Sequence, residues 1–210
     1  RQLGRQRALG ILDRIPTGWF ASILTAAFLA VTAAFGGLAA VASPPVAQLE
    51  AGETHENALF ALTVERAVLI DALPEAGLSV DDDQRVLAVV VTAENHWDRA
   101  VRADGDGGLA GSVRIAELGD EAPASIARFD DTTTAPYLQP RVPAQLVLAW
   151  AVDKDAVSAS EPVEVEVRDL SLYTGTLITD GESWVDPVVA ARITLDITDV
   201  GAGASSEETS

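Results

Sequence analysis

The side chains that could carry out acid–base chemistry in this sequence are two histidines and 32 carboxylates. A histidine-based active site needs a positioned partner for its imidazole. His55 lies in a polar stretch, and His96 follows Asn95 at the end of an apolar run, so we interpret both as surface histidines. The sequence contains no GxSxG, SxxK, glycine-rich phosphate-loop or HExxH spacing. It therefore predicts no catalytic residue and no enzyme activity.

Two groups of aspartates could bind calcium. Residues 81–83 form one group, and Asp104 and Asp106 form the other. An EF-hand is excluded because Gly108 and Ile115 stand where oxygen ligands belong. A calcium site built from two loops stays open, and aspartates solvated in turns are the alternative. We assign no metal ligand and no cofactor.

Trp97 and Trp184 are the candidate interaction residues. Both stand beside aspartates in sequence that is typical of loops. Tryptophans in such places are enriched at binding surfaces, and packing of the loop against the core is the alternative role. Trp150 alternates with apolar residues, so we expect it to be buried.

Charge is distributed unequally along the chain, whose formal net charge is −18. Residues 1–18 hold four arginines against Asp13, a net charge of +3, whereas residues 43–210 hold 10 basic and 31 acidic side chains, a net charge of −21. Such an acidic segment repels phosphates, so we expect no nucleic acid partner. Solubility explains the acidity, and a cationic ligand is the alternative. The absence of cysteine excludes disulfides, thiolate metal sites and a cysteine nucleophile.

Residues 19–42 form an uncharged apolar run of 24 residues. As a helix this run would extend about 36 Å, against about 30 Å for the hydrocarbon core of a membrane. We predict a transmembrane signal anchor that contacts the bilayer, with residues 1–18 as a basic cytoplasmic segment. Cleavage following Ala42, as in a secretory signal, is the alternative. Both alternatives place the remainder of the chain outside the cytoplasm.

Alternating apolar residues dominate the rest of the chain. The predicted strands cover residues 57–70, 85–94, 144–152, 163–168 and 188–198, with short strands at residues 113–115 and 126–129. Residues 57–70 carry an interruption at Glu65 and Arg66 that suggests a bulge. Residues 85–94 carry apolar residues on both faces, which suggests a central strand. About seven strands separated by turns predict an all-β, antiparallel sandwich. We place a linker at residues 43–56, the sandwich at 57–199 and a disordered acidic tail at 200–210.

Three stretches within residues 57–170 carry a family resemblance. They read FALTVERAVLIDALP, RVLAVVVTAEN and YLQPRVPAQLVLAWAVDKDAV. They resemble the telokin-like domain-of-unknown-function family of exported Gram-positive bacterial proteins. The family often has glycine at the position of Arg141, after the LQP turn, which leaves the conformation of that turn open. The resemblance implies an immunoglobulin-like sandwich that serves as an envelope-located binding or accessory module, with no catalytic residues to transfer.

These observations lead to two expectations for function. The first is a non-enzymatic, membrane-anchored accessory or interaction subunit of a cell-envelope membrane complex. The alternative is a stand-alone extracytoplasmic module that binds a metal, peptide or glycan. A deep aromatic cleft would favour the ligand-binding module, and a flat apolar patch would favour the subunit.

Overall fold

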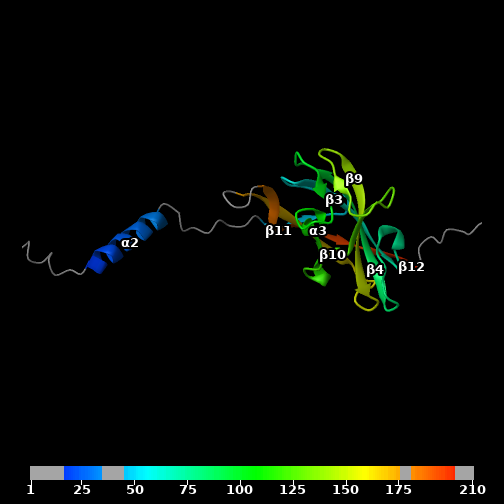
Figure 1. Ribbon diagram of the computed structural model, residues 1–210. Helices are drawn as coiled ribbons and strands as arrows, with labels where there is room; N and C mark the ends of the chain where they lie inside the picture. The colour runs from blue at the N-terminus through cyan, green and yellow to red at the C-terminus, as the bar shows by residue number, and fades with distance from the viewer. Residues whose placement is uncertain (1–16, 35–44, 176–180, 202–210) are drawn as a thin grey trace, which may run out of the picture. The chain divides into compact units, whose positions relative to one another are not determined.

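A computed structural model of the chain describes residues 17–34, 45–175 and 181–201. The chain divides into two compact units, residues 1–44 and 45–210. The first contains helix α2, Thr17–Ala34 (Figure 1). Among the described residues, no helix has both the length and the apolar character that a membrane crossing requires. The predicted span of residues 19–42 extends beyond α2 into residues 35–42, which lie outside the described residues, as do residues 1–16.

The second unit is a β-sandwich. Sheet A has the strand order β1-β11-β10-β6, and sheet B has the order β12-β3-β4-β9-β7, with β2 also paired to β3; β5 and β8 pair separately. The strands are β1 (Ala47–Leu49), β2 (Thr54–Glu56), β3 (Phe60–Ile70), β4 (Gln84–Asn95), β5 (Val101–Arg102), β6 (Val113–Ile115), β7 (Ser125–Arg128), β8 (Tyr137–Leu138), β9 (Pro143–Asp153), β10 (Val163–Thr174), β11 (Glu182–Leu195) and β12 (Ile197–Gly201).

Three short helices complete this unit. They are the 3-10 helix η1 (Pro74–Ala76), the α-helix α3 (Leu109–Ser112) and the 3-10 helix η2 (Ala116–Leu118). The loop around η1 covers the outer face of β4. There Val86 and Ala88 pack with Leu78 in a small second cluster. The prediction that β4 is central and apolar on both faces is confirmed, because β4 lies between β3 and β9.

The main core lies between the two sheets. Alternate residues of β4 and β9 face alternate residues of β10 and β11, as a two-layer sandwich requires. Trp150 is fully buried there, as predicted, and its Nε1 donates a hydrogen bond to the carbonyl of Glu121 over 3.1 Å. The bulge predicted in the first long strand is confirmed, because the register of β3 against β4 shifts between Val64 and Arg66.

The predicted linker, residues 43–56, is corrected by the structure. Residues 47–49 pair with β11 as β1, and residues 54–56 pair with β3 as β2. His55 on β2 is not an isolated surface histidine, because its Nε2 lies 2.8 Å from Oδ1 of Asp169 on β10. Asn57 donates to the same oxygen over 2.7 Å. Strands of three residues carry too little periodicity to be recognised in sequence, and polar contacts fasten them here.

The final predicted strand, residues 188–198, is two strands in different sheets. β11 ends at Leu195 in sheet A, and β12 begins at Ile197 in sheet B, where it runs parallel to β3. Ile197 continues the inward alternation of β11, which hides the change of sheet from sequence inspection. β1 also pairs in parallel, so the sandwich is not purely antiparallel. Val200 and Gly201 belong to β12 rather than to the predicted tail, and residues 202–210 lie outside the described residues.

An ion pair fixes β12 to the body of sheet B. Arg85 of β4 donates from both Nη atoms to the carboxylate of Asp199, over 2.9 and 2.6 Å. These bonds, with a further one from the backbone N–H of Gly201, lower the pKa of Asp199 to about 2 from an ordinary 3.8. Because the pKa is lower in the folded state, the charged carboxylate stabilises the fold above about pH 3.8. That stabilisation is lost as the pH falls toward 2.

Replacing Asp199 with asparagine should therefore destabilise the domain in a pH-dependent way. We expect Asp199→Asn to lower the melting temperature at pH 7, and this difference to vanish as the pH falls from about 4 to about 2. Thermal unfolding followed by circular dichroism at a series of pH values measures the melting temperature of each variant and its change with pH. Asp196→Asn is the control, because Asp196 is exposed and makes no ion pair within the described residues. An equal difference at every pH would contradict the role of the charge.

Candidate functional site

An open groove lies where the turns after β4 and before β9 meet the start of β11. Its volume is about 340 Å³, within the range of small-ligand sites. Its walls come from three segments that are far apart in the chain, within residues 97–107, at residue 137 and at residues 183–184: Trp97, Ala100, Val101, Arg102, Gly105, Gly107, Tyr137, Ser183 and Trp184. Three of these side chains are aromatic. The groove is therefore the best candidate for a functional site in the described residues.

Asn95, the last residue of β4, holds two of these segments in place. Its side chain is fully buried, and its Oδ1 accepts a hydrogen bond from the backbone N–H of Trp97 over 2.9 Å. Its Nδ2 donates to the carbonyls of Arg99 over 2.7 Å and Leu138 over 2.9 Å. One amide thus joins the turn that carries Trp97 to the segment that carries Tyr137.

The two predicted interaction residues, Trp97 and Trp184, are in contact. Their ring centroids lie 5.9 Å apart with an interplanar angle of 89°, an edge-to-face arrangement. Trp184 is only 7% exposed and belongs to the main core, and Trp97 is partly buried against that core. Much of their surface therefore packs loops, which is the alternative role for these residues, and the remainder lines the groove. The Nε1 of Trp184 is buried without a hydrogen-bond partner among the described residues.

A glycine-rich loop after β5 forms the floor of the groove. Gly107 lies against Trp184, since a Cβ there would approach the Trp184 carbonyl oxygen to 3.1 Å. Gly108 permits a closer approach, because a Cβ would lie 2.0 Å from the carbonyl oxygen of Arg102. Any other residue would displace the backbone at this point. Gly108 therefore lets the loop fold back onto Arg102, and Gly107 lets it pack closely against Trp184.

Two arginines lie at the groove, and each is paired with a carboxylate. Arg102 donates to both oxygens of Asp104, over 3.0 and 2.5 Å, and this hydrogen bonding holds the pKa of Asp104 below its usual range. The Nη2 of Arg99 lies 2.6 Å from Glu182, and its guanidinium carbon lies 5.0 Å from the centroid of the Trp97 ring. Both guanidinium charges are thus locally neutralised.

Sequence reasoning missed Tyr137 and Arg102 as groove residues. Tyr137 on β8 is 58% exposed and pairs with Arg102 on β5. The available signal for Tyr137 was a large aromatic residue between Pro136 and the LQP turn. Strands of two residues gave no periodic pattern, so nothing in the sequence indicated that Arg102 and Tyr137 are adjacent.

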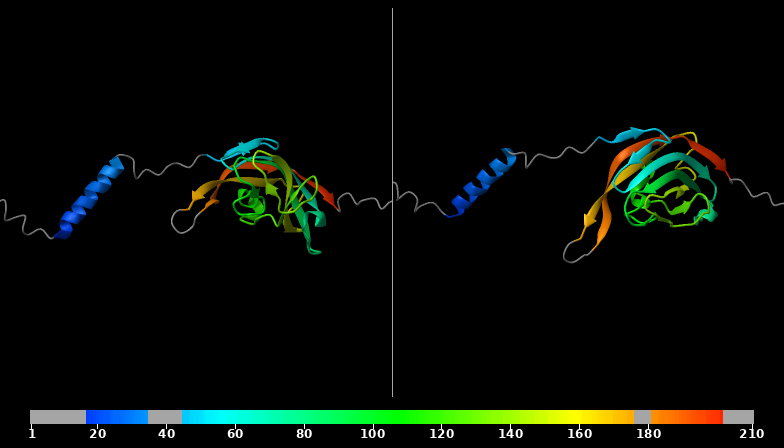
Figure 2. Two further views of the ribbon diagram at one scale, coloured as in Figure 1. Left: turned by 45° about the horizontal axis from the view of Figure 1, so that its top comes forward. Right: turned by 90° about the horizontal axis from the view of Figure 1, so that it is seen from above.

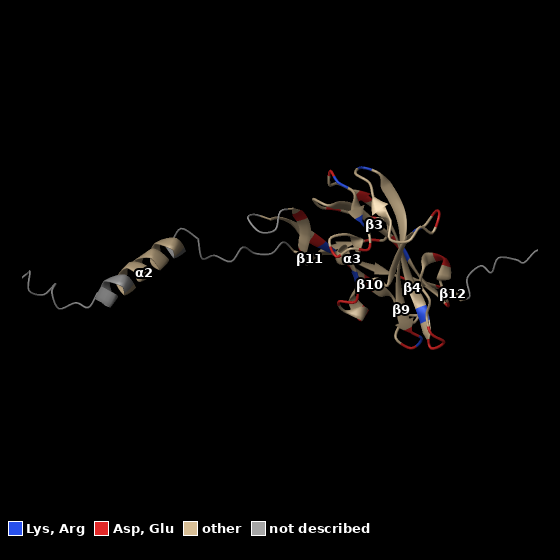
Figure 3. Cartoon of the chain, in the orientation of Figure 1, with Lys and Arg blue, Asp and Glu red and all other residues tan. Residues whose placement is uncertain are grey.

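The aspartates considered for calcium do not form a metal site in the described part of the chain. No group of three or more histidine, aspartate or glutamate residues there is placed to hold a metal ion. Asp104 is instead committed to Arg102. Figure 3 shows acidic residues on loops around the sandwich, with fewer basic residues among them. The other histidine, His96, has its Nε2 4.0 Å from Glu94.

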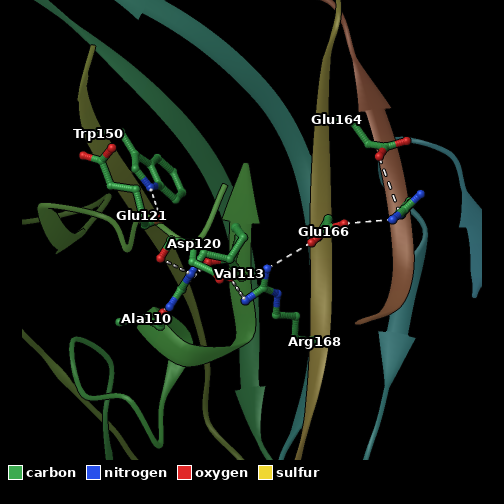
Figure 4. A network of polar contacts seen from close by, with 10 residues as sticks. Ala110, Val113, Asp120, Glu121, Trp150, Glu164, Glu166 and Arg168 are labelled. Carbon is green, nitrogen blue, oxygen red and sulfur yellow. Dashed lines mark hydrogen bonds and ion pairs between the residues drawn. The ribbon is translucent and has the colours of Figure 1, made fainter. Parts of the chain in front are cut away.

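A second polar cluster crosses sheet A (Figure 4). Arg192 of β11 lies 3.0 Å from Glu166 of β10, and Arg168 contacts both Glu166 and Asp120. Nearby, the buried guanidinium of Arg114 donates hydrogen bonds to the backbone carbonyls of Ala110, Val113 and Asp120. Burial lowers the pKa of Arg114. Each charged group already has protein partners. The cluster therefore fastens α3, β6 and β10 together, and its charged groups are paired within the part of the chain that the structure describes.

Comparison with known proteins does not assign a family. No protein-family model matches the chain, and no curated protein matches it. An uncharacterized β-sandwich protein from Clostridium difficile 630 aligns at a TM-score of 0.40 with 9% identity, over 74% of this chain and 99% of its own. A "putative lipoprotein" from Staphylococcus aureus aligns at 0.36 with 11% identity, over 70% and 94%. Neither similarity is close enough to support an argument about fold or function.

The LQP turn beside the groove contains a conformation that usually requires glycine. Arg141 has a φ of 60°, in the left-handed region. Its N–H donates to the carbonyl of Asn95 over 2.9 Å, and this bond fixes the turn. Arginine is disfavoured in this region by about 1 kcal/mol or more, because its Cβ crowds the following carbonyl oxygen. The backbone at Arg141 thus adopts the left-handed conformation that glycine would favour.

Replacing Arg141 with glycine should stabilise the domain. We expect Arg141→Gly to raise the free energy of unfolding by about 0.5–1 kcal/mol, the relief of the left-handed strain less the entropy that glycine adds to the unfolded chain. Urea unfolding of the full chain measures this change. Gln139→Gly is the control, because Gln139 does not have a positive φ, and it should destabilise. Destabilisation by both changes would show that Arg141 makes a contact worth more than the strain.

Proposed function

We propose that this chain is a non-enzymatic, extracytoplasmic interaction subunit of a cell-envelope membrane complex. The observation that supports this proposal is the hairpin of β10 and β11. Figure 2 shows these two strands running beyond the rest of the sandwich. β6 pairs only with residues 165–167 and β1 only with 191–193, so the remainder of the hairpin has no further strand on either side among the described residues.

The projecting part of the hairpin exposes apolar side chains. Leu172 is 42% exposed, Tyr173 is 51% exposed and Val188 is 59% exposed. We call these three residues the hairpin patch. Large apolar residues that gather on one projecting element are typical of protein–protein contact sites. Because Leu172 and Tyr173 are successive residues of β10, their side chains point to opposite faces, and the hairpin presents apolar surface on both of its sides.

A stand-alone ligand-binding module is the second candidate function. The aromatic groove favours it, because three aromatic side chains converge on a volume of ligand size. The groove is open rather than deep, however, and its base adjoins the hairpin through Ser183 and Trp184. An open aromatic groove beside an apolar hairpin is better suited to a polypeptide partner than to a small enclosed ligand.

Membership of the telokin-like family and attachment to the membrane are parts of the same proposal. The left-handed conformation of Arg141 supports the family resemblance, because the family often has glycine at that position. The basic residues before position 19 and the apolar run of residues 19–42 support export by a signal anchor, with cleavage following Ala42 as the alternative. An anchor would raise the local concentration of a weak binding surface near its membrane partner.

The hairpin patch can be tested by partner capture. The full chain would be recovered from its native membranes in mild detergent, and co-purifying proteins would be quantified by mass spectrometry. We expect a stoichiometric membrane protein with the native chain. Replacing Leu172, Tyr173 and Val188 together with serine should reduce its recovery about tenfold or more, since each buried apolar contact contributes on the order of 1 kcal/mol.

The matched control replaces exposed apolar residues away from the hairpin. Val142 is 52% exposed and Val200 is 42% exposed, and the double change Val142→Ser, Val200→Ser should leave capture unchanged. Equal melting temperatures would show that both variants are folded. Recovery of the native chain without any stoichiometric partner would contradict the subunit proposal. Equal loss in both variants would contradict the assignment to the hairpin.

A further inference from the structure

The aromatic groove has a charge environment that selects among polypeptide partners. We propose that the groove binds a basic, extended segment of the partner protein, with an arginine or lysine side chain lying against Tyr137 and the Trp97–Trp184 pair. This inference rests on the proposed function, because it names the chemistry of the partner at the base of the hairpin. It concerns a contact separate from the hairpin patch.

The carboxylates around the groove outnumber the cations. Asp98 follows Trp97, Asp104 and Asp106 flank Gly105, and Glu182 precedes Ser183. These four acids stand against Arg99 and Arg102, which leaves a local formal charge of −2. Arg99 pairs with Glu182 at 2.6 Å and with Asp98 at 3.8 Å, and Arg102 pairs with Asp104. Asp106 also interacts with the buried Arg114. The excess negative charge is therefore shared among these acids rather than carried by one unpaired carboxylate.

The net charge of the whole domain also favours a basic partner. Residues 43–210 carry a net charge of −21, from 31 acidic and 10 basic side chains. A field of this sign accelerates the approach of basic segments and repels acidic ones. An anionic partner, such as a phosphate-rich polymer, would meet this repulsion before it reached the aromatic residues.

One contact of the proposed kind lies beside the groove. The guanidinium of Arg99 lies 5.0 Å from the ring centroid of Trp97, where the ring quadrupole attracts a cation, and its Nη2 lies 2.6 Å from Glu182. Tyr137 presents a 58% exposed ring in the groove; Arg102, which is paired with Asp104, interacts with its hydroxyl, and no cation lies over its ring face among the described residues. A basic side chain from a partner would repeat at Tyr137 the arrangement that Arg99 makes at Trp97.

The shape of the groove fits an extended chain. A volume of about 340 Å³ accommodates one or two side chains, and the groove is open to solvent, so a peptide can enter and leave without unfolding. Glycines at positions 105 and 107 line the floor and leave backbone accessible for a peptide to approach. Tyr, Ser and Gly, with Trp at the strongest contacts, are also the residue types enriched in antibody binding loops, where they give adaptable contacts.

Calorimetric titration of the full chain in a neutral detergent without sugar groups tests the proposal. The probe is a nine-residue peptide of alternating serine and arginine with blocked termini, and citrulline replaces every arginine in the matched peptide. We expect only the arginine peptide to bind, and added salt to weaken it. Tyr137→Ser should weaken it about tenfold, as loss of a cation–π contact predicts. The double change Asp98→Asn, Asp106→Asn should weaken it about threefold.

Phe129→Ser is the matched control, because Phe129 is an aromatic residue that is 46% exposed and lies outside both the groove and the hairpin patch, and it should leave peptide affinity unchanged. Equal binding of the citrulline peptide, or equal weakening by Phe129→Ser, would overturn the proposal. So would binding of a neutral oligosaccharide of N-acetylglucosamine in place of the peptide, which would make the groove a glycan site. If Tyr137→Ser still captures the membrane partner in full, the groove proposal fails while the subunit proposal stands.

Discussion

The buried amide of Asn95 is the interaction on which the candidate site depends. It replaces backbone pairing at the point where β4 ends, and it satisfies three main-chain groups from two loops. Loops that leave a sheet expose polar backbone groups, and burying them without partners would be destabilising. Because one side chain supplies all three partners, the loops carrying Trp97 and Tyr137 can close over the core instead of remaining in solvent.

Side-chain packing around Trp184 also holds the groove together. The glycine-rich loop fits under Trp184, and the edge-to-face contact of Trp184 with Trp97 joins β11 to the turn after β4. Sheet A and sheet B are thus connected at this end by aromatic contact as well as by the core. The part of the hairpin that extends past β1 and β6 has no neighbouring strand among the described residues, and its side chains Leu172, Tyr173 and Val188 stay exposed. The groove therefore lies where β11 packs on the core, and the exposed apolar residues lie where the hairpin extends past the neighbouring strands.

The long strands could be predicted because burial imposes a period of two on them. β4 carried apolar residues on both faces, which indicated its central place, and the interruption at Glu65 marked a true bulge. The two-residue and three-residue strands could not be predicted, because their positions depend on partners such as Asp169 for His55. The change of sheet after Leu195 was hidden by Ile197, which is inward-facing in either sheet.

The candidate site was only partly accessible from sequence. Trp97 and Trp184 were identified separately by residue type, but their contact joins positions far apart in the chain, and nothing local encodes it. Tyr137 and Arg102 were missed because their adjacency arises from the pairing of β5 with β8. Asn95 was visible in the sequence only as the residue that ends an apolar run. Its three bonds arise from the tertiary fold, so they required the structure.

Hydrogen exchange of the Asn95→Ala variant would test this account most directly. Loss of the amide should lower the free energy of unfolding by about 3 kcal/mol, because buried main-chain groups lose their partners. The account predicts faster exchange in residues 96–102 and 136–142 together, with β3 and β9 still protected. Unchanged exchange in either segment would contradict the claim that Asn95 assembles the groove, and uniform acceleration across the domain would show that Asn95 supports only global stability.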